Sequence, residues 1–289
     1  MLRCAPQVLV THQLLMSDLP LTDVPEKARL IRRSIITMLA KAGSGHPGGA
    51  LGMADIFATL YFSVLNHRPT EPNWSERDRV IVSNGHINPV LYATLAFAGY
   101  FPESELETLR QFGSRLQGHP HRGALPGIEN TSGPLALGLS QACGLAAALR
   151  LQKNNAHVYC VLSDGEHDEG QTWEAYLFGA KEKLTNLTAI IDRNYIQIDG
   201  RTEDVLPLDN LVEKIMSFGW AVMEIDGHNV EQIEKALLVR SNESNQPTAI
   251  VCKTTPGKGV DFMENRFEWH GKAPSLEEAD KALEQLTTP

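Results

Sequence analysis

The sequence contains few cysteines, and none of them stand close together. Four occur in 289 residues, as Cys4, Cys143, Cys160 and Cys252, and two of these lie inside apolar runs. This spacing argues against a disulfide framework or a zinc-binding cysteine cluster. We therefore expect buried thiols and a cytoplasmic location.

Basic runs and uninterrupted apolar segments are also missing. Lys and Arg number 26 against 35 Asp and Glu, and the net charge of −9 includes no basic tail. Nucleic acid and anionic membranes are therefore disfavoured as main partners. The longest apolar stretch, around residues 135–149, is broken by Ser140 and Gln141, so no segment is expected to span a membrane.

The second half of the chain alternates between two kinds of hydrophobic pattern. Short apolar runs predict strands, and segments with helical spacing lie between them. The strands are expected near 157–162, 187–192, 220–225 and 248–253, with helices near 170–183, 209–218 and 229–241. Such alternation predicts an α/β fold, a mostly parallel sheet with helices on both faces. We assign residues 23–289 to one such domain, after a leader, residues 1–22, of uncertain order.

The first half is less regular. Asp23, Pro25 and Glu26 have the pattern of a helix start, and the helix should end in the glycine-rich break at 43–49. Further expectations are a helix at 53–65, a strand at 79–83, a helix at 89–98, a long loop at 117–134, a helix at 135–151 buried all round, and a last helix capped by Ser275 and Glu278.

Polar oxygens follow two successive strands of the predicted sheet. Asp164 and Gly165 end the first strand, and Asn194 lies just past the second. Parallel neighbours would bring both oxygens to one edge of the sheet, where α/β folds bind ligands. A carboxylate and an amide suit Mg²⁺ that also takes phosphate oxygens. Gly165 would let a phosphate approach the backbone, and the helix starting near Gly170 adds positive dipole.

Four of the ten histidines lie in loops rich in glycine and proline. They are His46 in Gly-His-Pro-Gly-Gly, His86 in Ser-Asn-Gly-His, His119 in Gly-His-Pro and His270 in Trp-His-Gly. Glycine beside a histidine lets a substrate approach without a Cβ collision. Neutral imidazoles both donate and accept, so a group of them can move protons among hydroxyls near pH 7. We expect His12, His67, His157 and His228 to be structural or solvated instead, and we assign no role to His121 or His167.

In this order and spacing the four histidine motifs resemble those of the transketolase family. Further matches are Thr-Ser-Gly-Pro-Leu from Thr131, Asp164-Gly165, Asp-Arg-Asn ending at Asn194, and Lys-Thr-Thr-Pro-Gly from Lys253. The resemblance covers residues 24–275 and implies a thiamine-diphosphate-binding fold. Ser163 departs from the family pattern, which has glycine there.

The resemblance also implies a role for each matching position. Metal ligands would be Asp164, Asn194 and the main-chain carbonyl of Ile196, around Mg²⁺ or else Ca²⁺ or Mn²⁺. Contacts to thiamine diphosphate would come from His86, Gly133, Leu135, Gly165, Asn194 and His270. The catalytic groups would be His46, His119 and His270, which face the sugar, and Glu169, which joins a carboxylate network reaching a neighbouring subunit.

A full-length transketolase looks about twice this long, and the other half supplies the glutamate that activates the cofactor. The chain resembles the N-terminal subunit of a split transketolase, and we expect a C-terminal, pyrimidine-binding partner in an α₂β₂ heterotetramer. Trp173 and Phe178 are candidates for partner contacts or, equally, for core packing. The expected reaction moves a two-carbon ketol unit from a ketose phosphate to an aldose phosphate, as in the pentose phosphate pathway. An unusual or sulfonated sugar, and a non-catalytic regulatory subunit, remain alternatives.

Overall fold

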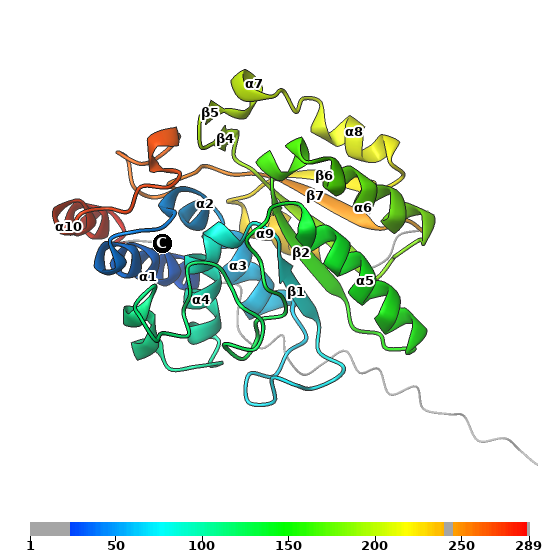
Figure 1. Cartoon of the computed structure of the whole chain (residues 1–289), viewed down its shortest axis with the longest axis horizontal. Coiled ribbons are helices and arrows are strands. Elements are labelled where there is room, and N and C mark those ends of the chain that lie inside the picture. Colours follow the sequence, from blue (N-terminus) through cyan, green and yellow to red (C-terminus); the bar gives the residue numbers. More distant parts are fainter. Residues whose placement is uncertain (1–23, 240–244, 288–289) are drawn as a thin grey trace, which may run out of the picture.

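The computed structural model describes residues 24–239 and 245–287. The leader at residues 1–22, Cys4 and the proposed cap Asp23 lie outside these ranges. In the described part the chain forms a five-stranded parallel sheet with the order β1-β2-β3-β7-β6. Figure 1 shows this sheet with β1 at one side and a separate short hairpin, β4-β5, near α7. The predicted parallel sheet is confirmed.

The strands of the sheet lie close to the predicted positions because each is a short apolar run. Their bounds are Arg79–Val82 for β1, Val158–Ser163 for β2, Leu187–Arg193 for β3, Ala221–Asp226 for β6 and Thr248–Lys253 for β7. The hairpin strands, Ile196–Gln197 and Gly200–Arg201, were not predicted. They follow Asn194 immediately, which places the hairpin at the carboxyl edge of the sheet.

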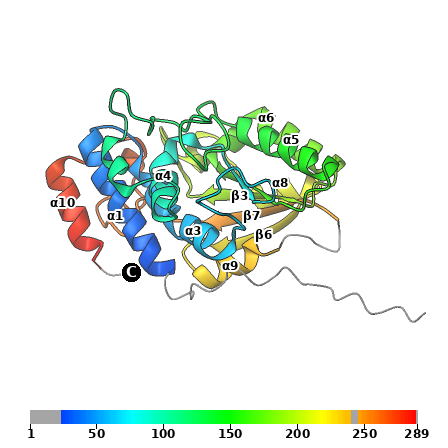
Figure 2. The same cartoon turned by 90° about the horizontal axis from the view of Figure 1, so that it is seen from below.

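Helices cover both faces of the sheet. Alternate residues of β2 divide the core: Tyr159 and Val161 pack with one hydrophobic cluster, Cys160 and Leu162 with the other. Figure 2 shows α5 and α6 on one side and α3 and α9 on the opposite side. The helices are Val24–Ala42 (α1), Pro47–Gly52 (α2), Ala54–Thr59 (α3), Asn88–Phe97 (α4), Leu137–Leu151 (α5), Gly170–Lys181 (α6), Thr202–Val205 (α7), Leu211–Ser217 (α8), Val230–Leu237 (α9) and Leu276–Gln285 (α10).

Two expectations for the first half of the chain were wrong. The glycine-rich segment 43–49 is not only a break, because α2 begins at Pro47 inside it, with His46 as its N-cap residue. The helix expected to be buried all round, α5, buries one face only, and Leu151 at its end is 83% exposed. The capping box of Ser275 and Glu278 is present at α10 as predicted.

The described thiols agree with the prediction from cysteine spacing. Cys143, Cys160 and Cys252 are buried and free. Within residues 24–239 and 245–287, no helix is both long and apolar enough to cross a membrane.

Candidate active site

The carboxyl ends of β2 and β3 bring Asp164 and Asn194 to one edge of the sheet. The two strands pair in register through Ser163 and Asp192, and the Asp164 N–H donates to the Asp192 carbonyl at 3.1 Å. The Asp164 carboxylate is fully buried and accepts hydrogen bonds from the N–H groups of Gly165 and Tyr195, both at 2.8 Å. The predicted meeting of these oxygens at the sheet edge is thus observed.

Asn194 is held by its neighbours in the turn that follows β3. Its Oδ1 accepts from the Ile196 N–H at 2.9 Å, and its Nδ2 donates to Asp192 Oδ2 at 2.9 Å. These bonds fix the side chain, and the short β4 strand begins at Ile196 directly beside it.

Two carboxylates are crowded together at this edge. Burial, and then the neighbouring Asp192 carboxylate, raises the pKa of Asp164 to about 7. Burial also raises the pKa of Asp192 to about 6. The raised pKa values mean that the surrounding protein groups do not fully stabilise the two negative charges. A bound cation would stabilise them. The described residues contain no cluster of three or more His, Cys, Asp or Glu side chains able to hold a metal. The donors present therefore suit a cation completed by amide, carbonyl and phosphate oxygens.

Three of the four loop histidines form a compact group. The ring centroids of His46 and His86 are 5.3 Å apart, those of His86 and His270 5.3 Å, and those of His46 and His270 5.7 Å. His119 lies beside them, since a Cβ built on Gly85 would come within 3.2 Å of its ring. His46 and His270 also line a pocket of about 330 Å³, together with Ile198. The structure thus brings residues of four distant sequence motifs together.

Burial keeps these imidazoles uncharged at neutral pH. It lowers the pKa of His86 to about 3 and that of His46 to about 4, with the neighbouring His270 as the next cause in both cases. The pKa values of His119 and His270 are lowered as well, again chiefly by burial. Each ring can therefore donate through one nitrogen and accept through the other.

The long loop at 117–134 is fastened over the turn that carries His86. The side-chain amide of Asn130 bonds both the N–H and the carbonyl of Val82, each at 3.1 Å, and so occupies the open edge of β1. Ser132 then lies against Gly85, where any larger residue would collide with its hydroxyl. The loop thereby places His119 and Gly133 next to the imidazole group.

Several buried polar atoms around the histidines have no hydrogen-bond partner among the described residues. They are both amide atoms of Asn84, Nδ1 of His46 and Oγ of Ser132. Buried polar groups are rarely left unpaired, so this region has the polar atoms that a bound polar molecule would satisfy. A Cβ on Gly133 would meet nothing within 4 Å, and one on Gly165 would meet only Gln197, at 3.8 Å. The backbone is therefore approachable at both glycines, as a diphosphate cofactor requires.

Comparison with known proteins decides the family. Residues 25–287 match the family model described as "Transketolase, thiamine diphosphate binding domain". The chain belongs to the transketolase family.

Two curated relatives of similar length are named as transketolase subunits. The chain is 38% identical, over 91% of its length and 96% of the relative's, to a 6-deoxy-6-sulfo-D-fructose transketolase subunit of Clostridium sp. (strain MSTE9). It is 37% identical, over 89% of its length and 91% of the relative's, to one of the subunits of the apulose-4-phosphate transketolase of Phocaeicola vulgatus. The crystal structure of Campylobacter jejuni transketolase matches 92% of this chain but 43% of its own, with 35% identity and a TM-score of 0.86. The fold is thus the α/β thiamine-diphosphate-binding fold of transketolases.

Two other positions implied by the family resemblance are exposed. Glu169 is the N-cap residue of α6, and Leu135 is 38% exposed just before α5. Both are available to groups outside this chain.

Two charged residues were missed by sequence reasoning. Glu166 belongs to an acidic run with the pattern of solvated carboxylates, yet its buried carboxylate accepts from the N–H groups of Ser163 and Ala136, at 2.8 and 2.7 Å, and from the Ser83 hydroxyl. At Ser163, which departs from the family pattern, the hydroxyl also lies 3.4 Å from Glu166 Oε2. Arg193 is the second residue, fully buried at the end of β3. No spacing signal distinguished either one.

Proposed function

We propose that this chain is the diphosphate- and metal-binding subunit of a two-chain transketolase, moving a two-carbon ketol unit from a ketose phosphate to an aldose phosphate. The observation that carries the proposal is the convergence of four uncharged imidazoles beside the edge that holds Asp164 and Asn194. Proton transfer among sugar hydroxyls needs the first feature, and a metal–diphosphate complex needs the second.

The residues at the sheet edge would hold the metal. Asp164, Asn194 and the Ile196 carbonyl are its ligands in this proposal, with Mg²⁺ as the metal and Ca²⁺ or Mn²⁺ as substitutes. The diphosphate would lie against Gly165 and Asn194, close to His86 and His270. The aminopyrimidine ring would meet the backbone at Gly133 and Leu135. When bound, thiamine diphosphate supplies the carbon nucleophile that breaks and forms the carbon–carbon bond.

The imidazoles would act on the sugar. His46 and His270 line the pocket beside Ile198, so they are the histidines that a ketose entering there reaches first. Each orients hydroxyls by donating through one nitrogen and accepting through the other. Because each ring is neutral, its free nitrogen can accept a proton without a prior deprotonation. His119, packed beside Gly85, would serve the same hydroxyls from the loop side.

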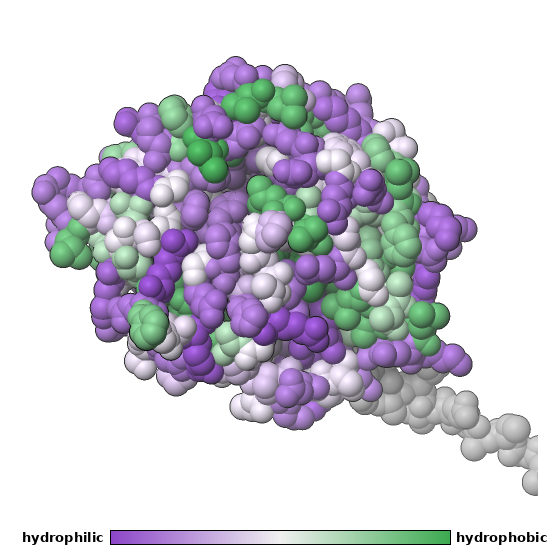
Figure 3. Space-filling view, in the orientation of Figure 1, coloured by the Kyte–Doolittle hydropathy of each residue, from purple (hydrophilic) through white to green (hydrophobic). Residues whose placement is uncertain are grey.

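A second chain completes the site in this proposal. Exposed Glu169 at the start of α6 is placed to meet a carboxylate of that chain, and Leu177 and Phe178 on the same helix are 57% and 45% exposed. Figure 3 shows apolar side chains gathered over the region where Figure 1 places α5 and α6. We propose an α₂β₂ assembly that covers this surface, in the cytoplasm.

A second candidate differs only in the sugar. The relatives that this chain matches over nearly their whole length are named for 6-deoxy-6-sulfo-D-fructose and apulose 4-phosphate. These names favour a specialised ketose over the pentose phosphate sugars. A non-catalytic regulatory role is disfavoured because the chain has Asp164, Asn194 and all four loop histidines.

Ketol transfer from xylulose 5-phosphate to ribose 5-phosphate, with thiamine diphosphate and Mg²⁺, tests the proposal. The chain is assayed alone and mixed with the chain encoded beside it. Activity only in the mixture is expected, whereas activity of this chain alone would contradict the shared site. Cofactor binding without turnover of these sugars moves the assignment to the second candidate, which 6-deoxy-6-sulfo-fructose and apulose 4-phosphate then test directly.

A further inference from the structure

Arg193 is a buried cation beside Asp164 and Asn194, the two residues at the proposed metal edge of the sheet. It is the last residue of β3 and only 1% exposed. Its Nη1 lies 3.3 Å from Asp164 Oδ2, while Nη2 donates to Glu203 Oε1 at 2.6 Å and to Asp209 Oδ1 at 2.8 Å. A buried charge is tolerated only when it is paired and hydrogen-bonded, and these three carboxylates meet that need.

The same guanidinium also contacts the turn at Tyr195, between the proposed ligands Asn194 and Ile196. It lies 4.0 Å above the Tyr195 ring, and Nη1 donates to the Thr202 hydroxyl at 3.0 Å. Tyr195 has a left-handed backbone, with φ of 62°, which costs energy unless its surroundings hold it there. The Thr202 N–H closes the arrangement by donating to the Tyr195 carbonyl at 3.0 Å. Arg193 thus contacts the Tyr195 ring directly, and it also bonds Asp164 and Thr202, the two residues that bond the Tyr195 peptide.

The orientation of the Asp164 carboxylate follows from these contacts. Gly165 N–H fixes Oδ1, while Oδ2 is fixed by the Tyr195 N–H and by Arg193. Removing the guanidinium would leave Oδ2 with one donor and release the Tyr195 ring that packs under it. The carboxylate would then lose the fixed direction that a metal ligand needs.

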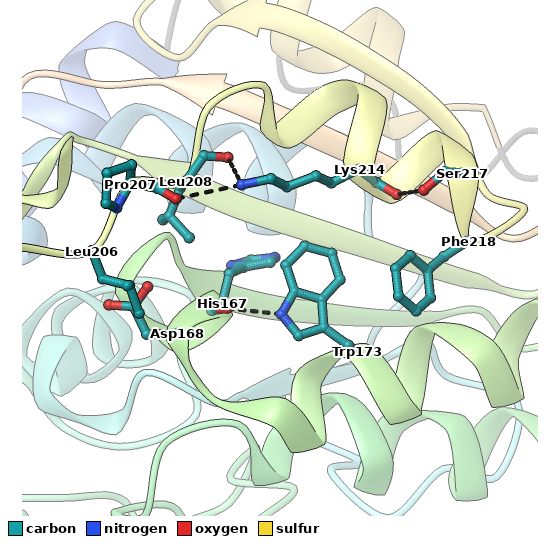
Figure 4. A pocket seen from close by; sticks show the side chains of 9 residues that line it. All are labelled: His167, Asp168, Trp173, Leu206, Pro207, Leu208, Lys214, Ser217 and Phe218. Atoms are coloured by element: carbon teal, nitrogen blue, oxygen red, sulfur yellow. Dashed lines mark hydrogen bonds between the residues drawn. The ribbon is translucent and has the colours of Figure 1, made fainter.

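Arg193 also links this turn to a more distant surface. Its partner Glu203 accepts weak bonds from the N–H groups of Leu208 and Asp209, at 3.3 and 3.4 Å. Leu208 belongs to one wall of a second pocket, of about 380 Å³, whose opposite wall includes Trp173 and Phe218. Figure 4 shows Leu206, Pro207 and Leu208 facing this hollow with Asp168 beside them. The wall is thereby connected to Asp164 through two side chains, Glu203 and Arg193.

We propose that Arg193 is a positioning residue for the metal site: it sets the direction of the Asp164 carboxylate and the backbone of Tyr195. The inference rests on the metal site of the proposed function. It predicts that metal affinity depends on the forked, planar shape of the guanidinium and not only on its charge, because two nitrogens serve two different sets of acceptors.

The test measures binding of Mn²⁺ by electron paramagnetic resonance, with thiamine diphosphate present and no sugar, on the full chain assembled with its partner. Arg193→Gln should weaken Mn²⁺ binding by about 10–100-fold, the usual cost of losing a group that orients a metal ligand. Arg193→Lys should recover only part of this loss. Asp209→Asn, which removes one exposed anchor of the guanidinium, should weaken binding by a few-fold and keeps the test open if Arg193→Gln does not fold.

The matched control is Arg77→Gln. Arg77 also forms a largely buried ion pair, with Glu129, but it precedes β1 and therefore lies at the opposite edge of the sheet. Its loss should lower thermal stability without changing Mn²⁺ affinity. Wild-type affinity in Arg193→Gln, or equal weakening in Arg77→Gln, overturns the positioning role. If the wild-type protein binds no Mn²⁺, both the proposed metal site and the positioning role of Arg193 are wrong. The ketol-transfer assay tests the rest of the proposed function separately.

Discussion

At the scale of single residues, the site depends on side chains whose charge is set by burial. His86 and His46 are packed among other imidazoles, where a proton would meet both a low dielectric and neighbouring positive charge. The pKa values of Asp164 and Asp192 are raised, chiefly by burial and, for Asp164, also by the neighbouring Asp192 carboxylate. In the proposed function, the neutral imidazoles would serve the sugar, and a bound cation would favour the charged form of the two carboxylates.

The pH dependence of folding tests the neutral state of His86. Its pKa is about 3 in the folded chain against an ordinary 6.5, so below pH 6.5 the unfolded chain binds a proton that the folded chain refuses. Stability present above pH 6.5 is therefore lost as the pH falls toward 3. The free energy of unfolding of the cofactor-free chain can be measured in urea at about pH 7.5 and about pH 5. It should fall less between these two pH values in His86→Gln than in wild type.

His121→Gln is the control for that comparison, because His121 is an exposed loop histidine. The free energy of unfolding of the His121→Gln variant should change between the two pH values as much as that of wild type. An identical loss in His86→Gln and wild type would show that burial does not suppress protonation of His86.

Replacement of a proposed metal ligand should abolish retention of the cofactor. Asp164→Asn keeps the shape of the side chain but removes the charge that faces the cation. With the partner present, Mg²⁺-dependent retention of thiamine diphosphate after gel filtration should fall by more than the roughly 10–100-fold typical of outer groups. Asp168→Asn, in the same turn, should retain the cofactor. Unchanged retention in Asp164→Asn would rule out Asp164 as a ligand.

At the scale of secondary-structure elements, one carboxylate joins three of them. Glu166 accepts from Ser83 after β1, from Ser163 at the end of β2 and from Ala136 before α5. Burial raises its pKa while these donors lower it. The loop and strand ends that carry His86, Asp164 and Gly133 are therefore tied to a common point.

Glu166→Gln should destabilise the chain although it changes few atoms. An amide NH₂ placed among donors leaves at least one N–H buried without an acceptor, at a cost of about 2–4 kcal/mol in unfolding free energy. Glu182→Gln, at the exposed end of α6, should change it by less than about 0.5 kcal/mol. Urea unfolding measures both, and equal effects of the two changes would exclude this role of Glu166.

The elements differ in how far their sequences determine them. The parallel strands were predicted within about a residue because the central strands β2, β3 and β7 are apolar runs buried on both faces. The helix α2 was missed because glycine and proline usually mark a break, whereas here Pro47 opens a helix whose glycines lie against other backbone, such as Gly48 against the Trp269 carbonyl. At the site, the motifs predicted the histidine group, but Glu166 and Arg193 act through contacts between distant segments, which spacing does not reveal.

At the scale of the whole molecule, the apolar surface is unevenly distributed. On α6, Leu177 and Phe178 are exposed while Trp173 is half-buried, with its ring near Phe218 and its N–H bonded to the His167 carbonyl at 2.8 Å. Trp173 therefore has the contacts of an ordinary core residue, and Phe178 remains the better candidate for a partner contact. Because Glu169 begins the same helix, a partner packed on α6 would also reach the metal edge.

A charge placed on this helix separates assembly from folding. Leu177→Asp puts a carboxylate in the proposed interface, where its desolvation should weaken association with the partner by at least about tenfold, or 1.4 kcal/mol. Because Leu177 is already 57% exposed, the isolated chain should keep its wild-type unfolding midpoint. Leu276→Asp is the matched control, since Leu276 is 72% exposed at the start of α10, which packs on α1 away from α6. Light scattering coupled to gel filtration over a dilution series should show dissociation of the Leu177→Asp assembly at a concentration at least about tenfold higher than that of the Leu276→Asp assembly. Equal assembly of both variants would move the interface off α6, and Glu169 would then have no partner carboxylate to meet.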